Sequence, residues 1–167
     1  GIKKQTKTKE RDLSKENNQI GLNNSLQDSS ISRTRTGEDL ANVLTAIGQQ
    51  RDDFLVDDAQ AFDVARRALM EETAAGGATD TGLGQQAIGQ QQDDRNRSSD
   101  RQMNEFRNQE AAKQLLATRT IDDLALSDTR SKQKKGQDDK AVDIDFEGYM
   151  SSLANEEKGF RLQNELD

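Results

Sequence analysis

This chain of 167 residues contains no proline, cysteine, histidine or tryptophan, and it carries a net charge of −7. Proline breaks helix interiors, because it lacks an amide hydrogen and its ring clashes with the preceding turn, so a chain without it can form long helices. Without histidine and cysteine, the chain lacks the commonest general base, the commonest metal ligand and the best nucleophile. The composition therefore favours a helical structural protein, with no catalytic residue, cofactor, metal or small-molecule substrate expected.

The chain has little apolar material from which to build a core. Hydrophobic residues make up 31% of it and charged residues 33%, and the mean hydropathy is −1.04. Ordering a backbone costs about 1–2 kcal/mol per residue, which so little apolar burial hardly offsets. We therefore expect folding to depend on identical copies or other partners, with a mostly disordered, solvated chain as the alternative.

Residues 1–35 are expected to form a polar, basic arm that is extended or weakly helical. This stretch holds eight basic and four acidic side chains, whereas residues 36–167 hold sixteen basic and twenty-seven acidic ones. Six basic residues could contact phosphates or anionic lipid headgroups, with a solvated arm as the alternative: Lys3, Lys4, Lys7, Lys9, Arg11 and Lys15. No apolar run approaches the ~20 residues that span a bilayer. No signal peptide is visible, and membrane contact by a segment upstream of Gly1 stays open.

The strongest helix is predicted over residues 37–73, with Thr36 as its N-terminal cap. Its apolar residues recur at helical spacing and form a narrow seam, which Arg51 and Asp58 interrupt. A long helix with one narrow seam requires a partner helix, so we expect the seam to carry assembly. The seam consists of Leu40, Val43, Leu44, Ile47, Phe54, Leu55, Phe62 and Leu69, with Ala65 on the same face.

Residues 74–84 are predicted to break the helix, because they are rich in glycine and other small residues. Either of the first two glycines can adopt the left-handed conformation of a helix C-terminus. The segment lacks the pattern of a phosphate-binding loop, and no strand precedes it. We therefore expect a hinge or hairpin turn at Gly76, Gly77, Gly82 and Gly84.

A second helix is predicted over 85–131, a charged linker over 131–140, and a third helix over 141–166. A short strand near 142–146 is the alternative, because Val142, Ile144 and Phe146 alternate with aspartates. The predicted fold is thus all-α: a polar arm (1–35), an elongated long-helix hairpin (36–135) and a linker with a C-terminal helix (136–167), ordered in a multi-copy assembly.

The sequence contains two further patterns. Adjacent carboxylates are plentiful, as at Asp52-Asp53, but neighbours on a helix point about 100° apart and form no convergent acid–base pair. Residues 46–53 match residues 87–94 at seven of eight positions. A repeat array needs about three regular units, so duplication and coincidence both stay open.

Residues 36–135 resemble the small internal virion (DNA-ejection) proteins of short-tailed bacteriophages. The likeness lies in long Ala/Gln/Asn-rich helices with few aromatic residues, and in the small-residue break from Ala74 to Gly84 that precedes a Gln/Arg-rich helix. The chain departs from those proteins in lacking their apolar N-terminal stretch, and no functional residue carries over.

The resemblance implies a virion component that joins a multi-copy tube near the portal, tail or core and lets DNA pass without specific contact. Its implied location is the virion, with the host cell envelope as a second location during infection. A phage scaffolding or head–tail accessory protein and a coiled-coil adaptor of a cellular complex are the alternatives.

Overall fold

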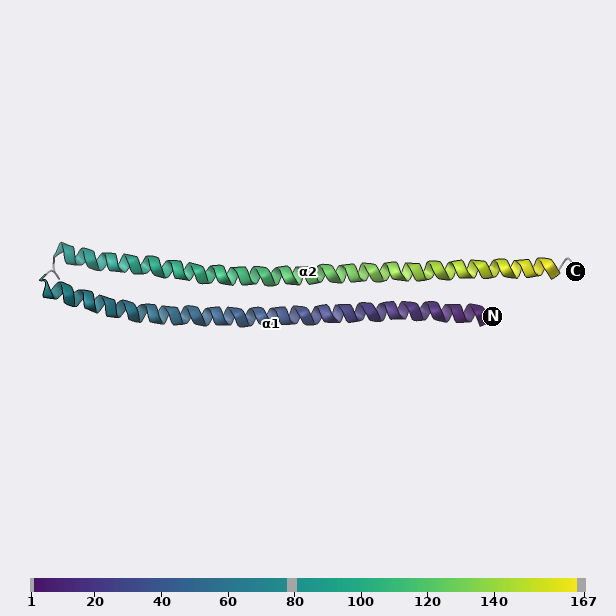
Figure 1. Cartoon of the computed structure of the whole chain (residues 1–167), viewed down its shortest axis with the longest axis horizontal. Helices are drawn as coiled ribbons and strands as arrows, with labels where there is room; N and C mark the ends of the chain where they lie inside the picture. The colour runs from purple at the N-terminus through teal and green to yellow at the C-terminus, as the bar shows by residue number, and fades with distance from the viewer. Residues whose placement is uncertain (1, 78–80, 165–167) are drawn as a thin grey trace. The chain divides into compact units, whose positions relative to one another are not determined.

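The structure is a computed structural model that describes residues 2–77 and 81–164. It contains two long helices, α1 (Ile2–Ala75) and α2 (Gly82–Asn164), and no strand among the described residues (Figure 1). The all-α prediction is confirmed, and two long helices separated by a turn are consistent with a helix hairpin. The predicted multi-copy order stays a prediction.

Several local predictions were wrong, because the helices extend much further than expected. Residues 2–35 form continuous helix, which contradicts the extended form of the predicted arm but not its helical alternative. Thr36 lies in the interior of α1 and caps nothing. Hydroxyl side chains, which are poor helix formers, are accommodated by bonding to the carbonyl four residues earlier, as Thr8 does to Lys4. The same bond recurs at Thr6, Ser14, Ser32 and Thr34.

The predicted linker at 131–140 and the alternative strand at 142–146 are also continuous helix within α2. In the linker, the basic and acidic residues lie one turn apart. Lys134 pairs with Asp138, and Lys135 pairs with Asp139. Opposite charges four residues apart stabilise a helix. The charged residues of 131–140, from which a linker was predicted, therefore stabilise α2 instead.

The chain divides into two compact units, each built from one segment of α1 and one of α2 (Figure 1). Unit 1 comprises Gly1–Arg35 and Thr120–Asp167, and unit 2 comprises Thr36–Arg119. In both units the two helical segments run antiparallel, as contacts such as Lys4–Glu157 and Arg33–Asp128 in unit 1 require.

Burial along the helices recurs every eleven residues, and the positions concerned are buried or half-buried. An eleven-residue repeat corresponds to about 3.67 residues per turn, which is close to the value of a straight α-helix. One face of each helix can therefore contact its partner over many turns without the left-handed supercoil that a seven-residue repeat imposes. In unit 2 these positions are Leu40, Arg51, Phe62 and Thr73 on α1 and Gly84, Arg95, Phe106 and Ala117 on α2. In unit 1 they are Lys7, Asn18, Ser29, Asp128, Asp139 and Met150.

The four glycines of the predicted break occupy different environments. Helix α1 ends at Ala75, and Gly77 adopts a φ of 68°, the left-handed conformation expected at a helix C-terminus. Gly82 and Gly84 instead belong to the first turn of α2, where the Gly84 amide donates to the Thr81 hydroxyl at 3.3 Å. The break is therefore narrower than predicted, and its residues 78–80 lie outside the described residues.

Candidate functional site

The predicted seam packs against α2 within unit 2. Ile47 is 6% exposed, and the ring of Phe54 lies 6.1 Å from the ring of Phe106, which is itself 6% exposed. The other members are half-buried, except that Leu55 is 42% exposed. The seam therefore finds a partner helix inside its own chain, and Leu55 lies at its margin. Its role in association between chains stays a prediction.

The two charged residues that interrupt the apolar seam are part of the packed face. Arg51 forms an ion pair with Glu110 at 3.6 Å, and Asp58 pairs with Arg95 at 3.0 Å. Both contacts join α1 to α2 within unit 2. A charged side chain at such a position fixes the register of the two helices, because a shifted helix would leave the charge half-buried and unpaired.

Two arginine side chains lie over the ring of Phe62. The guanidinium of Arg95 lies 4.4 Å from the centre of the phenyl ring, and that of Arg66 lies 5.6 Å from it. Arg66 also donates to the side chain of Gln92 at 3.4 Å. Cations over an aromatic face gain electrostatic attraction, so this face combines apolar burial with fixed positive charge.

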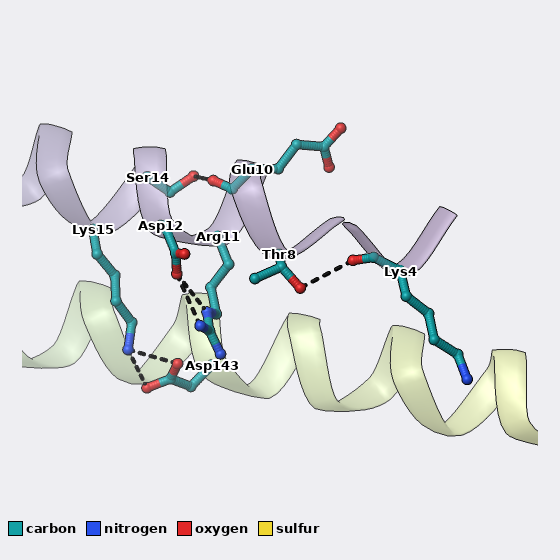
Figure 2. Close-up of polar contacts among 8 residues, drawn as sticks. All are labelled: Lys4, Thr8, Glu10, Arg11, Asp12, Ser14, Lys15 and Asp143. Carbon is teal, nitrogen blue, oxygen red and sulfur yellow. Dashed lines mark hydrogen bonds and ion pairs between the residues drawn. The ribbon is translucent and has the colours of Figure 1, made fainter. Parts of the chain in front are cut away.

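Four residues of the basic cluster contact α2 within unit 1, namely Lys4, Lys7, Arg11 and Lys15, whereas the carboxylates paired with Lys7 and Arg11 lie on α1. Figure 2 shows the ion pair between Lys15 and Asp143, whose nitrogen and oxygen lie 2.7 Å apart. Lys4 forms an ion pair with Glu157 at 3.1 Å. Arg11 lies 4.5 Å from the ring centre of Phe146 and also holds the neighbouring Asp12. Lys7 stacks on Tyr149 at 5.4 Å in the same way.

These four side chains stay partly exposed, and each has a partner within the chain. Lys3 and Lys9, by contrast, are exposed. Any phosphate or lipid contact by the cluster stays a prediction.

A polar layer lies deeper in unit 1, around Ser29. This residue is 6% exposed, and its hydroxyl makes no hydrogen bond of standard geometry among the described residues. The hydroxyl nevertheless lies close to Asp128, and its interaction with that carboxyl is the main cause that lowers the pKa of Asp128. Arg33, which forms an ion pair with Asp128, lowers this pKa further. Sequence patterns gave no signal for this layer, because serine and aspartate look like surface residues.

A second polar layer lies eleven residues before Ser29 on α1 and eleven residues after Asp128 on α2. The Asn18 amide donates to Asp139 at 3.0 Å, and Lys135 approaches the same carboxyl at 2.6 Å. The hydrogen bonds from Lys135 and then Asn18 lower the pKa of Asp139. Nearby, the hydroxyls of Ser25 and Ser131 lie 3.1 Å apart. Polar layers thus lie between the helices of unit 1, whereas unit 2 has the Phe54–Phe106 ring pair.

Neither a metal site nor a membrane-spanning helix occurs in the part of the chain that the structure describes. No cluster of acidic residues there has the geometry to hold a metal ion. Neither described helix contains a stretch apolar enough to cross a membrane. No protein-family model, curated protein or solved structure matches this chain.

Proposed function

We propose that this chain is a structural protein that acts by helix association in a multi-copy assembly. The observation that carries the proposal is how little the two helices cover each other. Within the described residues, the buried apolar side chains are Ile47, Phe106, Ala117 and Leu153, and each of them is still 6–8% exposed. A chain with so thin a core gains stability when further helices cover its half-exposed seam.

The specific assembly proposed is the DNA-ejection tube or portal-proximal core of a tailed phage. This step rests on the resemblance described above, which implies portal, tail or core proteins as partners. An acidic, amide-rich surface supports it physically, because like charge repels DNA phosphates and lets DNA slide without being held. The chain contains 17 glutamines and 10 asparagines, which offer hydrogen bonds without fixed charge.

Association can be tested through the exposed margin of the seam. Leu55 is 42% exposed, and Val64 is 70% exposed. The two lie nine residues apart on one helix, which at about 100° per residue places them on opposite faces. Leu55→Asp should weaken self-association in sedimentation velocity at least about tenfold in Kd, as expected for loss of a seam contact, whereas Val64→Asp serves as the matched control.

Equal effects of the two substitutions, or a wild-type chain that stays monomeric up to high concentration and binds no virion protein, would contradict the proposal. Mass spectrometry of purified particles then separates the candidates. An ejection protein remains in mature virions and leaves with the DNA, a scaffold departs before maturation, and a cellular adaptor is absent from particles.

A further inference from the structure

The two units differ in the balance of polar and apolar contacts between their helices. In unit 1, ion pairs and hydrogen bonds cross between the helices, and among its described apolar side chains only Leu153 is buried. In unit 2, the ion pairs Arg51–Glu110 and Asp58–Arg95 also cross, but three apolar side chains are buried beside them: Ile47, Phe106 and Ala117. The crossing polar contacts of unit 1 are Lys4–Glu157, Lys15–Asp143, Asn18–Asp139, Ser25–Ser131 and Arg33–Asp128.

The two segments of unit 1 also carry opposite net charge. Residues 1–35 hold eight basic and four acidic side chains, a net +4, whereas residues 120–167 hold seven basic and twelve acidic, a net −5. The pKa of Glu157 is lowered chiefly by its hydrogen bond from Lys4, as expected where pairing stabilises the charged carboxylate. The two segments therefore attract each other in two ways: through the individual ion pairs, and through the opposite net charges that they carry along their length.

We propose that unit 1 is a charge-held clasp. Residues 2–35 release from residues 120–164 when salt screens their ion pairs, while unit 2 keeps its helices paired. This inference goes beyond the assembly role and does not depend on it. While the clasp is closed, the chain's own carboxylates occupy Lys4, Lys15 and Arg33.

The expected release of unit 1 alone follows because salt weakens ion pairs but does not weaken buried apolar contacts in the same way. The Debye length falls from about 30 Å at 0.01 M to about 3 Å at 1 M salt, so attraction between partly exposed charges is largely lost. The side chains of Lys15 and Asp143 are 36% and 43% exposed, which leaves them open to this screening. Apolar contacts such as Phe54–Phe106 are not weakened in this way.

A released N-terminal segment should also lose its helical structure. Isolated helices without a packed face are marginal in water. This segment contains Asn17, Asn18, Asn23 and Asn24, which have low helix propensity. Opening of the clasp should therefore appear as local unfolding, in which backbone amides of unit 1 lose protection from solvent exchange.

Hydrogen exchange measured by mass spectrometry on the full chain tests the clasp directly. Between 20 mM and 1 M NaCl, amides in 4–33 and 124–157 should exchange at least about tenfold faster, and those in 40–73 and 84–117 should change less than about twofold. Loss of protection in both units together, or none in unit 1, would overturn the proposal.

A charge swap at one ion pair provides the matched test. At low salt, Lys15→Asp should open unit 1 and raise its exchange about tenfold, and adding Asp143→Lys should restore the protection. Lys134→Asp is the control, because it changes the charge equally but its partner, Asp138, lies on the same helix. If the double variant stays open, or if the control opens unit 1 equally, the clasp is not held by these charges.

Discussion

Phe106 gives the sharpest test of how the helices of unit 2 are held together. Replacing it with alanine removes roughly 150 Å² of buried apolar area, which at about 25 cal/mol per Å² corresponds to about 4 kcal/mol. Partial burial in the unfolded chain lowers this by roughly 10–40%. Because a two-helix unit can close around the gap or admit water, we expect a loss of about 2–3 kcal/mol in the free energy of unfolding.

Urea denaturation followed by circular dichroism, at one fixed protein concentration, measures this loss. Phe160→Ala is the matched control, because Phe160 is 68% exposed and should lose less than about 0.5 kcal/mol. A double-mutant cycle of Phe106→Ala with Phe54→Ala should give a coupling of about 0.5–1.5 kcal/mol for the ring pair. Equal effects at Phe106 and Phe160, or zero coupling, would refute the observed packing.

Three further predictions concern single positions. The neighbours of Asp128 hold its pKa below the ordinary 3.8, so its charge stabilises unit 1 above that pH and this contribution is lost as the pH falls through the lowered pKa. In Asp128→Asn, the protection of unit 1 amides from hydrogen exchange should depend less on pH between about pH 2 and 6 than in the wild-type chain. Gly77→Ala should lower the free energy of unfolding in urea by about 1–2 kcal/mol, because φ is 68° at this position. Gly82→Ala should raise it by up to about 1 kcal/mol, because an added Cβ meets no atom within 4 Å and alanine favours the helix. Ile47→Ala should cost about 2–4 kcal/mol by thermal or urea denaturation and Leu55→Ala less than about 1 kcal/mol, and a reversed order would place the packed face elsewhere.

The ends of the helices illustrate how far local sequence rules reach in this chain. Gly77 was among the predicted helix-ending glycines, and the structure gives it the left-handed conformation that such a position requires. The predicted N-terminal cap at Thr36 failed, because a capping pattern in the sequence cannot tell whether the preceding residues have a helical partner of their own. Residues 2–35 have such a partner in α2, which contacts Lys4, Arg11 and Lys15.

The packed face was the part that sequence periodicity could not identify. Apolar spacing correctly singled out Ile47 and Phe54, but it treated Arg51 and Asp58 as interruptions and counted Leu55 as a full member. In the structure, the arginine and the aspartate face α2, because each finds an opposite charge there. A search for apolar residues cannot detect a repeat whose members alternate between apolar and charged side chains.

The sequence by itself determined that this protein is helical and that a break lies within residues 74–84, although it also predicted a linker at 131–140, which is helix. The absence of proline allows each helix to run uninterrupted, and only the small-residue segment supplies the backbone freedom for a turn. Tertiary structure alone decided which face of each helix is covered and which charges meet. Pairing energy depends on the partner side chain across the interface, so residues such as Ser29 and Asp128 acquire their roles only when distant segments come together.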